Sequence, residues 1–111
     1  MQQPEQRLGK RIQLYCGRIN WLCIRYNTGK VQDAKTGKWI DFGPPTGHSD
    51  YIVYTDDGRA IFIETKIHPR KPTQEQLEWI DTMRSRGFGA YVIYSLEEFI
   101  TTVVGGKKVG K

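Results

Sequence analysis

The strongest constraint on the fold is a pair of β-rich runs separated by a glycine turn. Residues 51–55 and 60–64 consist largely of branched and aromatic side chains, and Asp56-Asp57-Gly58 lies between them. This arrangement is typical of a β-hairpin, because glycine adopts the positive φ that a tight turn needs. We therefore predict two neighbouring antiparallel strands at the centre of the fold.

The length of this turn decides which side chain faces Asp50. A three-residue turn pairs Thr55 with Arg59 and Asp50 with Glu64, whereas a two-residue turn pairs Asp50 with Thr65. Because successive residues of a strand point to opposite faces, a shift by one residue would separate the two acids. A site built on both acids therefore requires the three-residue turn or a compensating bulge.

Helical and strand patterns in the rest of the chain predict a single small α/β domain. Apolar residues recur at helical spacing near the N-terminus, and Thr73 with Gln76 forms a capping box that opens a second helix. The predicted order is a helix over 4–18, a buried strand over 21–26, the two hairpin strands, a helix from 73 to about Gly87, a strand over 90–94 and a short helix from the Ser95–Glu98 capping box to about 102. This α-β-β-β-α-β-α order predicts a central mixed sheet flanked by helices. We expect the domain to span residues 1–104 and a basic, flexible tail to follow over 105–111.

Residues 27–49 show no sustained periodicity. Lys35-Thr36-Gly37-Lys38 can turn a small hairpin within them, and the segment is otherwise rich in glycine and proline. Long irregular connections in a compact domain are usually functional or disordered. The segment is also basic and aromatic, so it is either a solvated loop or a nucleic-acid contact. The residues that favour a nucleic-acid contact are Lys30, Lys35, Lys38 and Trp39.

Charge and composition restrict the class of protein. The formal net charge is +5, and residues 1–47 hold eight Lys and Arg against three Asp and Glu, while residues 48–111 hold nine of each. Such an excess suits a polyanionic partner, because phosphates attract cationic side chains over long range. With no segment apolar enough for a membrane and no signal-peptide pattern, we expect a soluble, intracellular protein. Cys16 and Cys23 lack metal-ligand spacing and are expected to be buried free thiols.

A carboxylate and a lysine end the second hairpin strand. Glu64 and Lys66 are two residues apart and so point to the same face, and Asp50 joins them if the turn has three residues. Two carboxylates with the backbone carbonyl of Thr65 suit Mg²⁺ or Mn²⁺, which lowers the pKa of bound water, while Lys66 can orient that water or neutralise a phosphoryl oxygen. The pattern predicts metal-assisted phosphodiester hydrolysis. The alternative is a solvated Glu-Lys ion pair and an Asp in a turn.

Further segments lie around these residues in a fixed order along nearly the whole chain. They are Glu5, Asn27-Thr28-Gly29, Gly47-His48-Ser49-Asp50, Ile63-Glu64-Thr65-Lys66, Thr73 with Gln76, Gly87 and Tyr94-Ser95-Leu96-Glu97-Glu98. In this order and spacing the sequence resembles the virus-type replication-repair nuclease (VRR-NUC) domain, a branch of the PD-(D/E)XK nuclease superfamily. One departure is Ser49, which stands where the family usually has proline and so leaves the approach to Asp50 less rigid.

The resemblance implies a restriction-endonuclease-like core and a Mg²⁺- or Mn²⁺-dependent deoxyribonuclease. It assigns Asp50 and Glu64 as metal-binding acids, Lys66 as the catalytic lysine, Glu5 as the acid of the first helix and a further candidate metal ligand, and Gln76 as a supporting residue. Glu5 and Gln76 are equally explained by stabilising their helix ends. The resemblance further implies a homodimer, branched DNA such as Holliday junctions or flaps as substrate, a role in DNA repair, and a phage or bacterial origin.

Other polar residues are candidates for substrate contact. Arg70 and Lys71 follow the second hairpin strand and, with Lys30, Lys35 and Lys38, are the predicted nucleic-acid contacts. His48 is interpreted as a loop histidine, because oxygen-preferring metals do not need imidazole. Two other functions remain open: a non-catalytic nucleic-acid-binding module, and a component of a repair or replication complex that needs a partner for activity.

Overall fold

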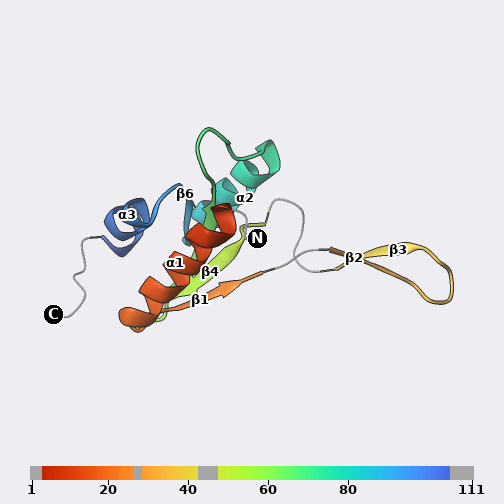
Figure 1. Ribbon diagram of the computed structural model, residues 1–111, viewed down its shortest axis with the longest axis horizontal. Helices are drawn as coiled ribbons and strands as arrows, with labels where there is room; N and C mark the ends of the chain where they lie inside the picture. Colours follow the sequence, from red (N-terminus) through yellow and green to blue (C-terminus); the bar gives the residue numbers. More distant parts are fainter. Residues whose placement is uncertain (1–3, 27–28, 43–47, 106–111) are drawn as a thin grey trace.

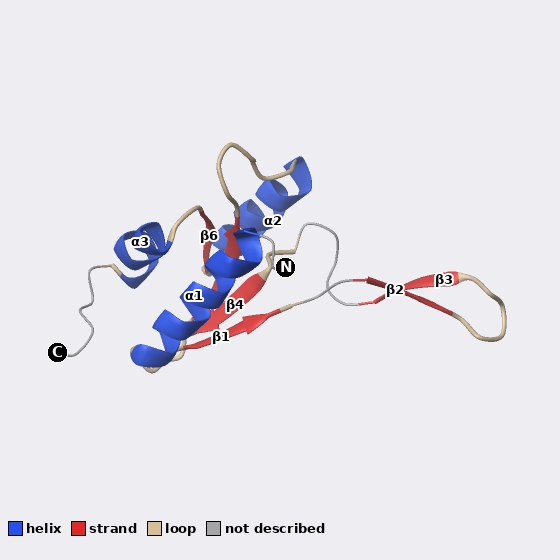
Figure 2. Ribbon diagram, viewed as in Figure 1, coloured by secondary structure: helices blue, strands red, loops and turns tan. Residues whose placement is uncertain are grey.

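The computed structural model describes residues 4–26, 29–42 and 48–105 (Figure 1). A four-stranded mixed sheet in the order β1-β4-β5-β6 carries the helices, and a separate hairpin of β2 and β3 projects from this body (Figures 1 and 2). The elements are α1 (Pro4–Arg18), β1 (Leu22–Arg25), β2 (Gly29–Gln32), β3 (Trp39–Phe42), β4 (Tyr51–Tyr54), β5 (Ala60–Thr65), α2 (Gln74–Ser85), β6 (Gly89–Ile93), α3 (Leu96–Glu98) and a π-helix (Phe99–Val104). The predicted small α/β domain with a central mixed sheet is confirmed; the predicted tail falls, from residue 106 onward, outside the described residues.

The turn between β4 and β5 has three residues. Tyr51 pairs with Ile63, and the ladder continues to the Tyr54–Ala60 pair. The Thr55 N–H donates to the Arg59 carbonyl at 2.9 Å, and Gly58 has a φ of +87°. The predicted register is therefore confirmed, and Asp50 and Glu64 lie one residue beyond the last pair of the ladder.

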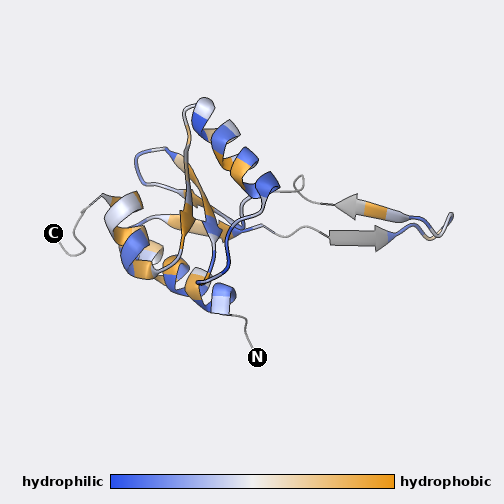
Figure 3. Ribbon diagram, turned by 90° about the horizontal axis from the view of Figure 1, so that it is seen from above, coloured by the Kyte–Doolittle hydropathy of each residue, from blue (hydrophilic) through white to orange (hydrophobic). Residues whose placement is uncertain are grey.

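The two faces of the sheet carry different helices. Alternation along β5 sends Ile61 and Ile63 into a core shared with α1 and the C-terminal helical segment, while Phe62 packs with Ile80 and Met83 from α2. Figure 3 shows α1 and α2 on opposite sides of the sheet. The crossover through α2 brings β6 parallel to β5. Cys16 and Cys23 are free and buried, as predicted.

The first strand differs from its prediction. The sequence predicts a buried strand over 21–26, but β1 is the edge strand of the sheet and pairs only with β4 among the described elements. Cys23 points into the core, whereas Leu22 is 57% exposed and Ile24 is also exposed. An apolar run alone does not reveal whether a strand lies at the centre or the edge of a sheet, because that depends on pairing with distant segments.

The segment that showed no periodicity forms a second, two-stranded sheet. Gln32 pairs with Trp39, and the turn between them is closed by Asp33, whose side chain accepts hydrogen bonds from the Lys35 N–H (2.9 Å) and the Thr36 hydroxyl (3.1 Å). Figure 1 shows this β2–β3 hairpin extending away from the body as an arm. The predicted α-β-β-β-α-β-α order therefore lacks two strands, β2 and β3. The small hairpin suggested by Lys35-Thr36-Gly37-Lys38 is present, but it extends beyond these four residues into both strands.

The helix ends follow their sequence signals with one exception. Thr73 and Gln76 form the complete capping box of α2, and Gly87 follows the helix with a φ of +91°. Ser95 caps α3, but the Glu98 carboxylate accepts from the Tyr94 N–H at 2.7 Å, one residue before the expected donor. Beyond α3 the chain widens into a π-helix, in which Phe99, Val103 and Val104 are buried. None of the described helices is long and apolar enough to cross a membrane.

Candidate active site

Asp50 and Glu64 lie where two adjacent strands meet the same end of the sheet. Asp50 immediately precedes β4 and Glu64 is the penultimate residue of β5, so the antiparallel pairing brings them together. Asp50 Oδ2 accepts hydrogen bonds from the Thr65 hydroxyl at 3.0 Å and from the Thr65 N–H at 3.3 Å. These bonds hold one carboxylate oxygen of Asp50 against the strand end.

Glu64 is a buried carboxylate with one satisfied and one unsatisfied oxygen. Glu64 is only 2% exposed to solvent. Oε2 accepts a 2.8 Å hydrogen bond from Gln76 Nε2 and lies 3.8 Å from Lys66 Nζ, whereas the buried Oε1 has no hydrogen-bond partner in the described structure. Lys66 is itself only 6% exposed, so the contact between Glu64 and Lys66 lies in the protein interior, where charges interact more strongly than in water.

The Gln76 amide contacts both the helix end and the site. Its Oε1 accepts from the Thr73 N–H at 2.8 Å, and its backbone N–H donates to Thr73 Oγ1 at 3.1 Å. Since a backbone N–H can only donate, the amide oxygen must face Thr73, and the NH₂ group is left to face Glu64. The two interpretations of Gln76, as a cap and as a neighbour of the acids, therefore hold together.

Glu5 reaches the acids from α1. A cavity of about 120 Å³ is lined by Glu5 and Asp50 together with Gln6, Arg25, Tyr51 and Thr65. Glu5 Oε2 is 3.4 Å from Arg70 Nη1, and this buried oxygen makes no hydrogen bond. The first helix thus brings a third carboxylate to the strand ends, with Arg70 at the outer side.

The electrostatics of Glu64 reflect this crowding. Burial is the main cause that raises the pKa of Glu64, and the neighbouring Asp50 carboxylate raises it further. The Lys66 ammonium opposes the shift, Glu5 adds to it, and the resulting pKa is about 8. Buried acids with strongly shifted pKa values are concentrated at functional sites.

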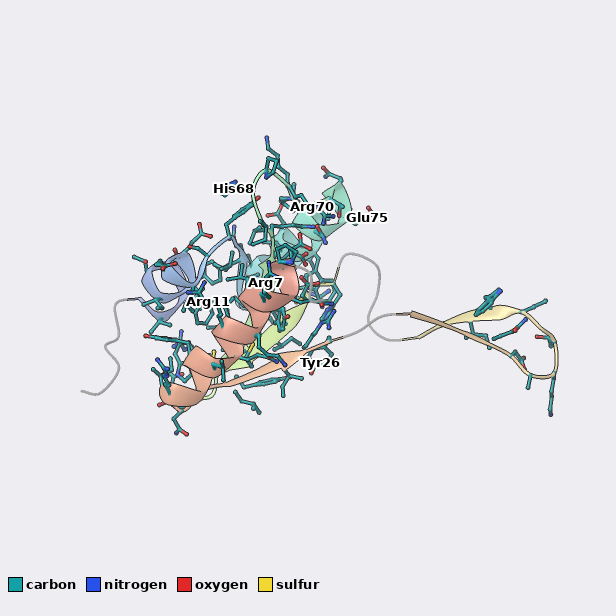
Figure 4. The ribbon with its side chains drawn as sticks, in the orientation of Figure 1. Arg7, Arg11, Tyr26, His68, Arg70 and Glu75 are labelled. Atoms are coloured by element: carbon teal, nitrogen blue, oxygen red, sulfur yellow. The ribbon has the colours of Figure 1, made fainter. Side chains whose placement is uncertain are left out.

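The remaining predicted residues are distributed around this cluster. Lys71 is exposed on the loop between β5 and α2, on which Figure 4 also shows His68 and Arg70, and Lys35 and Lys38 are exposed on the β2–β3 hairpin. Lys30 lies in β2, but its side chain is outside the described part of the chain, as are Asn27, Thr28 and Gly47.

His48 is held in an aromatic cluster. Its ring lies 4.6 Å from Trp79 and 5.5 Å from Tyr26, measured between ring centroids, and Nδ1 is 2.6 Å from the Ser49 carbonyl. Burial lowers the pKa of His48, although the Ser49 carbonyl and Asp50 oppose that shift. These contacts agree with the interpretation of His48 as a packed loop histidine.

Sequence reasoning missed two groups at the site. Arg25, at the end of β1, lines the same cavity as Asp50, because β1 pairs with β4 in a register that places Arg25 opposite Tyr51. The sequence analysis assigns a role only to the backbone carbonyl of Thr65, whereas the structure shows that its hydroxyl orients Asp50. The local sequence around Arg25 does not indicate that this residue lies at the site, because the partner strand of β1 is far away in the chain.

Carboxylate oxygens are the available metal-binding groups. Within the described ranges, no group of three or more His, Cys, Asp or Glu side chains is arranged to hold a metal ion. Asp50 and Glu64, with Glu5 beside them, are nevertheless hard oxygen donors of the kind that Mg²⁺ and Mn²⁺ accept together with several waters. Two of their buried oxygens lack hydrogen bonds.

Comparison with known proteins gives one informative match. No protein-family model matches the sequence, and no curated protein matches it. Among solved structures, a chain described as a VRR_NUC domain superposes with a TM-score of 0.65; the match covers 90% of this chain and 94% of that chain, at 20% sequence identity. At this identity the similarity establishes the architecture, and the chain has the fold of a VRR-NUC domain.

Proposed function

We propose that this chain is a metal-dependent, structure-selective endonuclease that hydrolyses phosphodiester bonds in DNA, with branched DNA such as Holliday junctions or flaps as its substrate. The observation that carries the proposal is the convergence of Glu5, Asp50 and Glu64 beside the buried Lys66. A purely structural cluster would be expected to satisfy its buried oxygens, yet Glu64 Oε1 has no hydrogen-bond partner among the described residues, and Glu5 Oε2 has only the Arg70 guanidinium at 3.4 Å. The VRR-NUC fold supports the same class of activity.

The donor set fits a divalent cation. Asp50, Glu64 and the Thr65 carbonyl, with Glu5 as a further candidate, would hold Mg²⁺ or Mn²⁺. Burial and the neighbouring Asp50 and Glu5 carboxylates raise the pKa of Glu64, so a cation held between these acids would relieve their mutual repulsion. When bound, the cation supplies Lewis-acid polarisation of the phosphate and makes water a better nucleophile near neutral pH.

The protein groups have separate roles in this proposal. Lys66, held near Glu64, neutralises negative charge that develops on the phosphoryl oxygens, where a buried ammonium acts more strongly than one in water. Gln76 fixes the orientation of the Glu64 carboxylate through Oε2. Thr65 does the same for Asp50 through Oδ2. Both acids are thereby held in fixed orientations, and their remaining oxygens would be available to a bound cation without reorganising.

Basic residues outside the cluster would bind the substrate backbone. Lys35 and Lys38 lie on the projecting hairpin, where Trp39 is 65% exposed. We include them with Lys30, Arg70 and Lys71 as contacts to phosphates, because an arm that extends from the body can reach DNA at some distance from the cut. A homodimer would present two such sites to two strands of a junction.

A cleavage assay tests the proposal. Labelled single-stranded, duplex, flap and four-way-junction DNA are incubated with wild type, Lys66→Ala and a control, Lys10→Ala, which removes an exposed lysine of α1. We expect cleavage of the branched substrates in Mg²⁺ or Mn²⁺, none in EDTA, and none with Lys66→Ala, while binding and the control stay close to wild type.

Other outcomes separate the alternatives. Steeply salt-dependent binding without cleavage in either metal would favour a non-catalytic module. Cleavage that begins only when a replication or repair partner is added would favour a component of a larger complex. Cleavage retained by both Asp50→Ala and Lys66→Ala would overturn the proposed site.

A further inference from the structure

A second cavity lies between α1 and the segments that follow β5 and β6. It has a volume of about 310 Å³ and is lined by Arg7, Leu8, Arg11, Ile67, Tyr94 and Ser95, among other residues. Ile67 directly follows Lys66, and Arg7 is two residues after Glu5. The cavity is therefore lined by chain neighbours of two proposed catalytic residues and is distinct from the smaller cavity that contains Asp50.

Positive charge is concentrated on one wall of this cavity. Arg7 and Arg11 are four residues apart in α1, so their side chains emerge from the same face of the helix one turn apart. Both are exposed, and they are the charged residues among the described residues that line the cavity. Figure 4 shows them along α1, below the loop that carries His68 and Arg70. Guanidinium groups bind phosphate by paired hydrogen bonds, which suits this wall to a phosphodiester.

The rest of the cavity is apolar and aromatic. Leu8 and Ile67 supply aliphatic surface, and the Tyr94 ring is stacked on His68 with centroids 4.2 Å apart and an interplanar angle of 15°. Apolar and aromatic surface next to a phosphate site gains little from a duplex, whose bases are paired and stacked in its interior. It suits the sugar and base of a nucleotide whose base is not paired, since such a base can leave its stack.

We infer that this cavity is a subsite for one unpaired nucleotide of the strand that is cut, with its phosphate on Arg7 and Arg11 and its sugar and base against Leu8, Ile67 and Tyr94. The inference rests on the proposed nuclease function and narrows its substrate. The strand must offer an unpaired nucleotide within a few positions of the cut, as flaps and branch points do. A fully paired duplex leaves the subsite empty.

A backbone-charge scan tests the phosphate contact. Flap DNA carries a single neutral methylphosphonate at each of the positions within three nucleotides of the branch, and binding is measured in EDTA by fluorescence anisotropy. The proteins are the full-length wild type, Arg11→Ala and Arg18→Ala, the last being an exposed arginine at the other end of α1. We expect one position at which the neutral linkage weakens wild-type binding roughly tenfold. Arg11→Ala should bind unmodified DNA more weakly and show a smaller further loss at that position, because only Arg7 then contacts the phosphate, while Arg18→Ala should resemble wild type.

Removal of one base tests the other half of the subsite. An abasic residue at the position found by the scan should weaken wild-type binding, and duplex DNA of the same length should compete poorly with the flap. Equal competition by duplex would overturn the requirement for an unpaired nucleotide. A change in sedimentation of Arg11→Ala from dimer to monomer would overturn the subsite in favour of a contact between copies.

The outcomes for the subsite and for the nuclease are distinguishable. If neutral linkages affect wild type and Arg11→Ala alike at every position, the subsite is overturned, even when the same preparation still cuts DNA in Mg²⁺. If Arg11→Ala loses binding at the expected position but the wild type cuts nothing in either metal, the subsite stands and the proposed activity fails.

Discussion

The side-chain amide of Gln76 donates a 2.8 Å hydrogen bond to Glu64 Oε2 while its oxygen accepts from the Thr73 N–H. One residue therefore closes the first turn of α2 and orients a buried acid of the site. The two roles depend on different ends of the amide, so a substitution can remove one and keep the other.

Gln76→Glu should keep the helix cap and remove the hydrogen bond that the Gln76 amide donates to Glu64. A glutamate at this position still accepts from the Thr73 N–H, as in the usual capping box, but it cannot donate to Glu64. We expect the melting temperature at pH 6 to stay near that of wild type, because Glu64 is then protonated, and cleavage to fall at least tenfold. Wild-type cleavage by this variant would show that Gln76 serves the helix alone.

Thr73→Ala is the matched control for that experiment. It removes the hydroxyl that accepts from the Gln76 N–H but leaves the backbone N–H that binds the amide oxygen. We expect a loss of about 1 kcal/mol in the free energy of unfolding, measured in urea, and nearly unchanged cleavage at 25 °C.

The stability of the metal-free protein should decrease as the pH rises from 5 to 8. Burial raises the pKa of Glu64 from an ordinary value of 4.5 to about 8, so the folded protein keeps a proton that the unfolded chain releases over this range. The stabilising contribution of protonated Glu64 is therefore fully present below pH 4.5 and is lost as the pH rises through about 8. Thermal unfolding in EDTA measures this loss directly.

Two comparisons identify the source of that pH dependence. Glu64→Gln should flatten the profile, because its side chain does not ionise. Mg²⁺ or Mn²⁺ should reduce the decrease at pH 8 in the wild type, because metal ligation favours the ionised carboxylate. Parallel profiles for wild type and Glu64→Gln would show that another group titrates.

Local signals accounted for much of this architecture. The turn at Gly58 determines the register of β4 and β5, and that register alone brings Asp50 next to Glu64. The capping box of Thr73 likewise determines where α2 begins and hence where Gln76 lies. Both features depend on residues close together in the sequence, which is why the patterns around them were sufficient.

Features that depend on distant contacts were not predictable in the same way. The edge position of β1 and the place of Arg25 at the site follow from pairing with β4, some 30 residues away in the chain. The approach of Glu5 depends on how α1 packs on the sheet, which no pattern within the helix describes. Trp39 and Ile40 of the projecting hairpin are both exposed, so the described side chains of this element show no alternation between buried and exposed positions.

Removing two of the lysines of the β2–β3 hairpin, those at its turn, should weaken DNA binding without affecting the fold. Lys35 and Lys38 are exposed on an element outside the main sheet, so Lys35→Ala/Lys38→Ala should unfold at the wild-type temperature. If both contact phosphates, the slope of log affinity against log salt should become shallower by about 2. Arg18→Ala/Arg86→Ala changes the net charge equally at exposed positions of α1 and the end of α2. An equal change in slope for this control would contradict a specific role of the hairpin.

The close approach of α1 to the sheet depends on Gly9. A Cβ at this position would lie 1.9 Å from the Tyr51 hydroxyl oxygen, and Tyr51 is only 3% exposed, so its ring has little room to move. We expect Gly9→Ala to lower the free energy of unfolding by about 1–3 kcal/mol, as overpacking does, although alanine is the better helix former. Gly17→Ala is the matched control in the same helix, where a Cβ meets nothing within 4 Å, and it should be neutral or stabilising by up to about 1 kcal/mol. Urea unfolding of both variants distinguishes the cost of overpacking from the effect of helix propensity.

Because Gly9 lies one helical turn from Glu5, a displaced helix should also reduce cleavage by Gly9→Ala at temperatures where it stays folded. Equal stability of the two variants would show that α1 can shift away from Tyr51 at little cost.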